Sequence, residues 1–201
     1  MTTCNYTARQ IGPRVYTRPI EESDWQSLQA IYGDFKDFPL TDEQAQQLAN
    51  VWARNMRECV WPFTESTHQQ SCTLFCLNSN DTAIGLMRTN NIGFKVETLL
   101  TIIHPDYKNQ GYFNEAVNML NHLAWEHWNC EAIVAELRTD IATRQYIRGS
   151  LEVESTRLSE GLKAIEHRKT TLTRAGWNAY KASSSYVEPV YTLHPYWPPE
   201  E

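Results

Sequence analysis

The sequence has no apolar run that approaches the roughly 20 residues of a membrane-spanning helix. Its first residues, MTTCNYTARQIG, lack the apolar core of a secretory signal. Basic residues are also few, because 18 Lys and Arg stand against 24 Asp and Glu, for a formal net charge of −6. This balance argues against broad non-specific binding of nucleic acid. We therefore expect a soluble, cytoplasmic protein that makes no membrane contact.

Paired cysteine motifs are absent as well. The five cysteines are an odd number, none forms a CxxC pair, and no Cys and His cluster completes a zinc site. We expect reduced, buried thiols and no bound metal. The sequence also has neither the GxGxxG nor the GxxxxGK[ST] pattern, which argues against a transferase that uses NAD or a nucleoside triphosphate.

The length of 201 residues predicts one domain, 1–201, with a substantial core. Residues 1–12 are polar and are predicted to form an irregular N-terminal arm. The Pro-rich residues 194–201 are predicted to form an irregular tail.

Residues 96–128 carry the clearest pattern in the chain. Val96 to Ile103 is rich in Thr, Leu and Ile, which predicts a strand, and a polar loop with Gly111 follows it. Apolar residues then recur at helical spacing, at Phe113, Ala116, Val117, Leu120, Leu123, Ala124 and Trp128. The N-terminus of such a helix offers unpaired N–H groups and a partial positive charge, which suit a phosphate or pyrophosphate.

The stretch HPDYKNQGYFNEAV (104–117) resembles the acetyl-CoA loop of the GCN5-related N-acetyltransferase (GNAT) superfamily. In the family pattern, Arg/Gln-x-x-Gly-x-Gly/Ala, Lys108 matches the first position in kind and Gly111 the central glycine. Phe113 stands where the family has Gly or Ala, so its side chain must point away from the cofactor. The opening, TRPIEESDWQSLQAIYGD (17–34), is similar to the branch that includes ribosomal-protein N-terminal acetyltransferases.

The resemblance implies an α/β fold, the acyl-CoA N-acyltransferase fold, whose mixed central sheet is flanked by helices. In that fold two parallel strands splay apart and acetyl-CoA lies in the gap; here they are 94–103 and 132–137. Further strands are predicted at 14–18, 72–77, 83–88 and, at a sheet edge because of Pro189, 186–193. Helices are predicted to open at Glu22 and at Thr41, where Gln44 completes a capping box.

Residues 139–175 read as an extended or inserted helical segment, with more basic than acidic residues. Two alignments to the family compete. Thr139-x-x-Ala142-x-x-x-Tyr146 is similar to the motif that supplies a catalytic tyrosine, and Leu172-x-x-x-Gly176-Trp177 is similar to the end of the same helix. The basic face has three interpretations: a solvated surface, a homodimer contact, or an arm that faces nucleic acid.

The resemblance implies transfer of an acetyl group from acetyl-CoA to a primary amine of a small molecule or a protein. Glu97 matches the position of the general base in histone acetyltransferases, and Tyr146 is the candidate acid for the leaving thiolate. The residues carried over for cofactor binding are Thr101, Ile103, Lys108, Asn109, Gln110, Gly111, Tyr112, Phe113 and Asn114. The alternatives are a catalytically degenerate binding or assembly protein of the same fold, and a nucleic-acid-modifying enzyme of the same fold.

Overall fold

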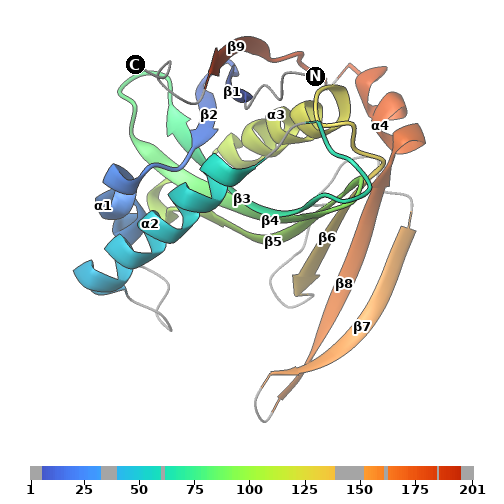
Figure 1. The fold of residues 1–201 in the computed structure, drawn as a ribbon. Coiled ribbons are helices and arrows are strands. Elements are labelled where there is room, and N and C mark those ends of the chain that lie inside the picture. The colour runs from blue at the N-terminus through green and yellow to red at the C-terminus, as the bar shows by residue number, and fades with distance from the viewer. Residues whose placement is uncertain are drawn as a thin grey trace.

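The computed structural model describes residues 6–32, 40–59, 62–138, 152–160, 163–184 and 186–195. Within them, nine strands form one sheet in the order β7-β8-β6-β5-β4-β3-β2-β1-β9 (Figure 1). The strands are Tyr6–Ile11 (β1), Val15–Pro19 (β2), His68–Leu77 (β3), Ala83–Ile92 (β4), Lys95–Ile103 (β5), Ala132–Arg138 (β6), Glu152–Glu160 (β7), Lys163–Thr173 (β8) and Val190–Pro195 (β9). The α-helices are Trp25–Tyr32 (α1), Asp42–Glu58 (α2), Tyr112–Glu126 (α3) and Arg174–Lys181 (α4). Two 3-10 turns, Glu22–Asp24 (η1) and Pro105–Tyr107 (η2), precede α1 and α3.

The sheet is mixed, as expected. Only β5 and β6 are a parallel pair among the described strands, and α3 is the crossover between them. The α/β fold class predicted from the sequence is therefore confirmed. The capping box of α2 is confirmed too, because the Gln44 N–H donates to Thr41 Oγ1 and the Thr41 N–H donates to Gln44 Oε1.

Helices cover the two faces of the sheet separately. Leu74 lies in a cluster with Trp52 and Met56 of α2, whereas its neighbour Phe75 packs with the α3 residues Ala116, Val117, Met119 and Leu120. Successive residues of a strand point to opposite faces. Therefore α1 and α2 cover one face and α3 covers the other.

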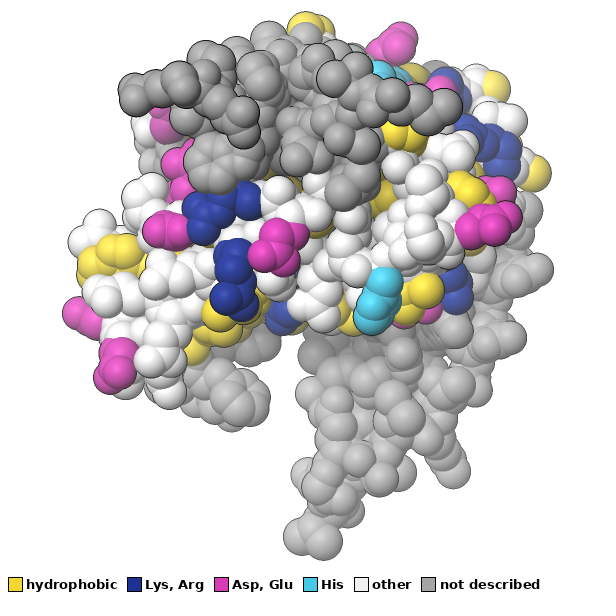
Figure 2. Space-filling view, viewed as in Figure 1, with side chains coloured by type: hydrophobic (Ala, Val, Ile, Leu, Met, Phe, Trp, Pro, Cys, Tyr) yellow, Lys and Arg dark blue, Asp and Glu magenta, His cyan; other side chains and the backbone are white. Residues whose placement is uncertain are grey.

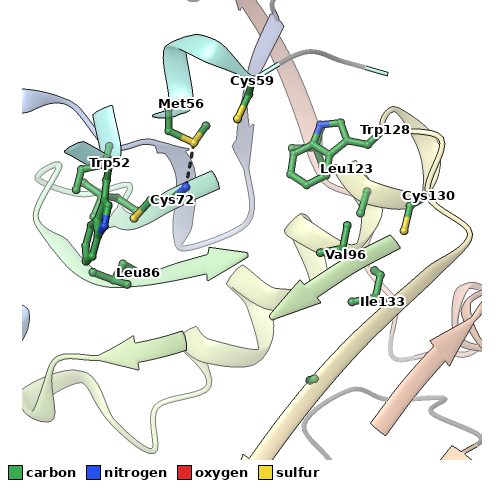
Figure 3. Packing of buried hydrophobic residues seen from close by; sticks show 14 of the residues in the cluster. Trp52, Met56, Cys59, Cys72, Leu86, Val96, Leu123, Trp128, Cys130 and Ile133 are labelled. Atoms are coloured by element: carbon green, nitrogen blue, oxygen red, sulfur yellow. Dashed lines mark hydrogen bonds between the residues drawn. The ribbon is translucent and has the colours of Figure 1, made fainter. Parts of the chain in front are cut away.

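The larger hydrophobic cluster joins the two halves of the core (Figure 3). On one side, the Cys72 N–H donates to the Met56 sulfur at 2.9 Å, next to Trp52 and Leu86. On the other, Val96 and Ile133 of the parallel pair pack with Leu123 and Trp128, as Figure 3 shows.

The four described cysteines are buried and free, and burial raises the pKa of the Cys59 thiol to about 12. None of the described helices is long and apolar enough to cross a bilayer.

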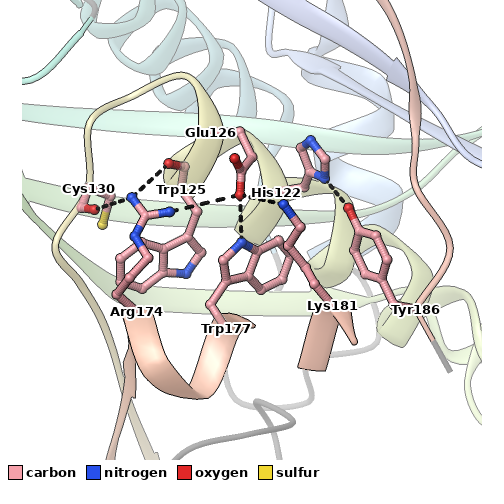
Figure 4. A network of polar contacts seen from close by, with 8 residues as sticks. All are labelled: His122, Trp125, Glu126, Cys130, Arg174, Trp177, Lys181 and Tyr186. Carbon is pink, nitrogen blue, oxygen red and sulfur yellow. Dashed lines mark hydrogen bonds and ion pairs between the residues drawn. The ribbon is translucent and has the colours of Figure 1, made fainter. Parts of the chain in front are cut away.

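A network of polar and aromatic side chains attaches the C-terminal segment to α3 (Figure 4). Glu126 of α3 accepts hydrogen bonds from the Trp177 indole at 2.8 Å and from Lys181 at 3.1 Å. Burial alone would raise the pKa of Glu126, but these two bonds lower it. His122 hydrogen-bonds to the Tyr186 hydroxyl, and burial lowers its pKa to about 4. The network thus joins the C-terminal half of α3 to α4 and to Tyr186.

The structure contradicts three expectations, which concern the N-terminal arm, the segment 139–175 and the C-terminal tail. Residues 6–11 are a strand and not an irregular arm, because they pair with 190–195 along six positions. The described part of 139–175 is not helical up to Thr173, because 163–173 pairs with β6 on one side and β7 on the other. The apolar spacing there is outweighed by two ladders of backbone hydrogen bonds and by β-branched residues such as Val153, Thr156 and Ile165.

The first positions of the predicted tail also belong to β9, which pairs through Pro195. Like the predicted edge strand, β9 lies at the end of the sheet. Residues 139–151, with Tyr146, and residues 196–201 lie outside the described residues.

Candidate functional site

The two parallel strands separate part-way along their length. They pair from Lys95–Ala132 to Thr98–Ala135, and within the described residues the pairing ends there, although β5 continues to Ile103. The separation coincides with a bulge, since Thr98 pairs with Thr89 but the next pair on β4 is Leu100 with Arg88. The extra residue, Leu99, has a side chain that is 48% exposed. The expected splay is therefore present, and Thr101 and Ile103 lie on the strand beyond it.

The loop between β5 and α3 exposes the start of the helix. Asn109 has a φ of 62° and Gly111 a φ of 86°, both in the left-handed region. Gly111 is the N-cap of α3 and supplies no side-chain cap, so the first N–H groups of the helix depend on other acceptors. Lys108, Gln110 and Asn114 are exposed around it. This geometry suits an anion, because the helix end carries a partial positive charge.

Arg14, in the turn between β1 and β2, braces this loop. Its Nη1 donates to the Gln110 carbonyl at 3.0 Å, and its Nε donates to Glu115 Oε2 at 3.0 Å. The guanidinium also lies over the Tyr112 ring at 4.7 Å. A Cβ on Gly111 would come within 3.2 Å of Arg14 Nη2. The backbone conformation thus favours glycine, and a Cβ at this position would also displace the end of the Arg14 side chain slightly.

Sequence reasoning missed Arg14 as a site residue. It lies 96 residues before Gln110, so no local motif connects the two. The only signal in the sequence was a basic residue at the start of a predicted strand, which is too common to be informative.

Phe113 does not obstruct the site. Its ring is partly buried and packs against the cluster of Val15, Phe75 and Ile84 on the sheet side of α3. The side chain thus points away from the exposed helix end, as the sequence required of a bulky residue at this position.

Glu97 lies before the splay, on the face that α1 and α2 cover. Its neighbour Val96 packs with α3 residues, so the Glu97 side chain takes the opposite face. Its Oε1 is 3.1 Å from Lys95 Nζ, and the side chain is about one third exposed, at 32%. Glu97 therefore does not face the Gly111 loop directly.

No group of His, Cys, Asp and Glu in the described part of the chain has the arrangement of a metal site.

Comparison with known proteins decides the family. The model of a family described as an acetyltransferase (GNAT) domain matches residues 14–143, which contain both the splayed strands and the Gly111 loop. The chain belongs to the GNAT acetyltransferase family. It is thus an acyl-CoA-dependent N-acetyltransferase of a family that uses acetyl-CoA and acts on amines. No curated protein matches the sequence.

Solved structures show the same fold at low identity. A GNAT-family acetyltransferase from Bacillus anthracis has 14% identity and a TM-score of 0.62, with 82% of this chain and 98% of that chain covered. A GCN5-related N-acetyltransferase from Brucella melitensis has 12% identity and a TM-score of 0.65, covering 86% and 81%. An enzyme from Salmonella typhimurium that modifies the N-terminal serine of ribosomal protein L7/L12 has 12% identity and a TM-score of 0.63, covering 83% and 99%. These likenesses establish the fold of the acetyltransferase.

Proposed function

We propose that this acetyltransferase binds acetyl-CoA along β5 and at the N-terminus of α3, and acetylates a primary amine that approaches from the α1/α2 face. The observation that carries the proposal is the exposed, uncapped start of α3 behind Gly111, next to a strand that has left its parallel partner. The residues fit the cofactor, because the left-handed glycine keeps a side chain out of the loop.

In this proposal the pyrophosphate is held by backbone N–H groups of the segment Lys108–Asn114, which comprises Lys108, Asn109, Gln110, Gly111, Tyr112, Phe113 and Asn114. Arg14 adds a guanidinium at the same place, where a bidentate donor suits phosphate oxygens. The backbone of Thr101 and Ile103, beyond the last β5–β6 pair, holds the pantetheine arm by hydrogen bonds of the kind that add a strand to a sheet.

Bound acetyl-CoA supplies an acetyl group activated as a thioester. Glu97 takes a proton from the acceptor amine, directly or through one water, because it is a carboxylate placed one residue before the splay. Lys95 holds the Glu97 carboxylate at the sheet surface. Tyr146 is proposed to return a proton to the leaving sulfur; it lies outside the described residues.

The substitution Glu97→Gln tests the assignment of the base. It keeps the shape of the side chain but removes its basicity, so we expect kcat to fall by roughly 100-fold or more. The acetyl-CoA KM should stay unchanged, because Glu97 does not face the Gly111 loop. Glu131→Gln is the matched control, because Glu131 is an exposed carboxylate directly before β6. A kcat for Glu97→Gln equal to that of the control contradicts the assignment.

The degenerate binding protein is not favoured by any described feature. A bulky side chain in the cofactor loop and a long basic helix would favour it, but the Phe113 ring packs against the core and the described residues of 139–175 up to Thr173 are strands. Homodimer formation, nucleic-acid contact and a cytoplasmic location stay predictions from the sequence.

A further inference from the structure

A polar pocket lies on the α1/α2 face of the sheet, apart from the Gly111 loop. It has a volume of about 530 Å³ and lies between the C-terminal end of α2, residues 62–67 and the first residues of β3. Ligand pockets commonly measure about 300–1,000 Å³, so this one has room for a small polar molecule. None of its lining residues belongs to the proposed cofactor site.

The pocket connects to Glu97 through one row of side chains across the sheet. Gln70 of β3 is paired with Asn90 of β4, and Asn90 is paired with Glu97 of β5. Directly opposed residues of antiparallel strands have Cβ atoms roughly 4.5–5.5 Å apart on the same face. Gln70 and Asn90 line the pocket, so its inner end adjoins the carboxylate that we propose as the base.

The lining of the pocket defines the chemistry of its ligand. Side-chain amides and hydroxyls dominate it, and each can both donate and accept hydrogen bonds. Among the described lining residues, Glu58 is the only carboxylate, His68 the only imidazole and Pro62 the only apolar side chain, and no Lys or Arg is present. In Figure 2 the surface between the C-terminal end of α2 and the 62–67 segment is largely white, the colour of uncharged polar side chains and backbone.

Two structural contacts keep the floor of the pocket in place. Gln70 Oε1 accepts a hydrogen bond from Arg88 Nη2 at 3.2 Å, and the Arg88 guanidinium lies 4.6 Å from the centre of the Trp52 ring. The Thr67 hydroxyl accepts from the Thr64 N–H at 2.8 Å, which closes the 62–67 segment on itself. The Gln70 and Thr67 side chains are thus ordered before a ligand binds, which lowers the entropic cost of binding to them.

We propose that this pocket holds the acetyl acceptor, and that the acceptor is an amine carrying several hydroxyl groups, such as an amino sugar. The inference rests on the proposed function, because it takes Glu97 as the base beside the pocket. Hydroxyl groups match the amides and hydroxyls of the lining, and one ammonium matches the single Glu58 carboxylate. A polyamine would need a carboxylate for each further ammonium, and an apolar amine would need an apolar wall.

The test is calorimetric binding of glucosamine to the full chain without acetyl-CoA, so that it does not depend on catalysis. We expect saturable binding that Glu58→Gln weakens about tenfold, the loss typical of a hydrogen bond to a charged group. Asn90→Leu should weaken it as well, by removing an amide beside Glu97. Glu43→Gln, an equivalent charge change at the other end of α2, should leave binding unchanged. Circular dichroism of each variant checks that it is folded.

Spermidine and a tripeptide with an N-terminal serine serve as competing acceptor classes. If either binds and glucosamine does not, or if Glu58→Gln and Asn90→Leu bind glucosamine like Glu43→Gln, the pocket proposal is overturned. Failure of the proposed function gives a different result: glucosamine binds and is sensitive to Glu58→Gln, but the protein neither binds acetyl-CoA nor acetylates the sugar.

Discussion

Replacement of Arg14 by glutamine should weaken acetyl-CoA binding selectively through the phosphates. The guanidinium lies against the Gly111 loop through the Gln110 carbonyl and the Tyr112 ring. The neutral side chain of the Arg14→Gln variant would be too short and too weak a donor to supply this charge. The fold should tolerate the change, because Glu115 Oε1 keeps its hydrogen bonds from the backbone N–H groups of residues 14 and 15, at 2.7 and 3.1 Å.

The expected magnitude follows from the exposure of the side chain. Hydrogen bonds to charged groups contribute roughly 1.5–3 kcal/mol. Arg14 is 49% exposed, so we take the lower end, about 1.5 kcal/mol, which is about tenfold in Kd at 25 °C. The lost ion pair with Glu115 should cost less than about 1 kcal/mol of folding free energy, because it lies at the surface.

The assay is isothermal titration of acetyl-CoA and of acetyl-pantetheine, which lacks the phosphates. Arg14→Gln should lose about tenfold in affinity for the first ligand and nothing for the second. Arg54→Gln, an exposed substitution on α2, controls for the change in net charge. Equal losses for both ligands would show that Arg14 only shapes the loop, and no loss for either would refute its role altogether.

Two further predictions concern the segment that fixes α3. His122 has its pKa lowered by burial to about 4, against about 6.5 when unfolded, so between these values only the unfolded state binds the proton. Stability should therefore fall by up to about 3 kcal/mol as the pH drops from 6.5 to 4, and urea unfolding should show a shallower fall in His122→Gln. Trp177→Ala removes a fully buried indole that donates to Glu126, so its free energy of unfolding, measured with urea at neutral pH, should be about 3–5 kcal/mol lower. An unchanged midpoint for Trp177→Ala, or parallel pH profiles for His122→Gln and wild type, would contradict the role given to this network.

The sequence was sufficient to predict those features that depend on residues close together in the chain. The capping box at Thr41, the strand that ends at Ile103 and the glycine before α3 are all encoded within a few residues. The parallel pairing of β5 with β6 was predictable because a strand, a helix and a strand in succession favour a crossover. The resemblance in 104–117 then located the candidate cofactor loop.

The features that the sequence did not predict depend on contacts between residues that are far apart along the chain. The segment 163–173 has apolar residues at helical spacing, yet it becomes β8 because β6 offers it a ladder of seven pairs. Residues 6–11 become a strand because 190–195 reaches them from the other end of the chain. Arg14 and the polar pocket are of the same kind, since each combines groups from separate segments that only the fold brings together.

The central claim is that Gly111 and the start of α3 form the acetyl-CoA site, and calorimetry with acetyl-CoA on three proteins tests it most directly. Wild type should bind, and Gly111→Asp should not, because its carboxylate would repel pyrophosphate at the helix end. Gly93→Asp is the matched control, because Gly93 also has a positive φ, 56°, but lies in the turn before β5, where a Cβ would make only an ordinary contact with the Glu65 carbonyl oxygen at 3.7 Å. The account predicts binding by wild type and Gly93→Asp alone. Failure of the wild type to bind, or binding by Gly111→Asp equal to that of Gly93→Asp, would contradict it.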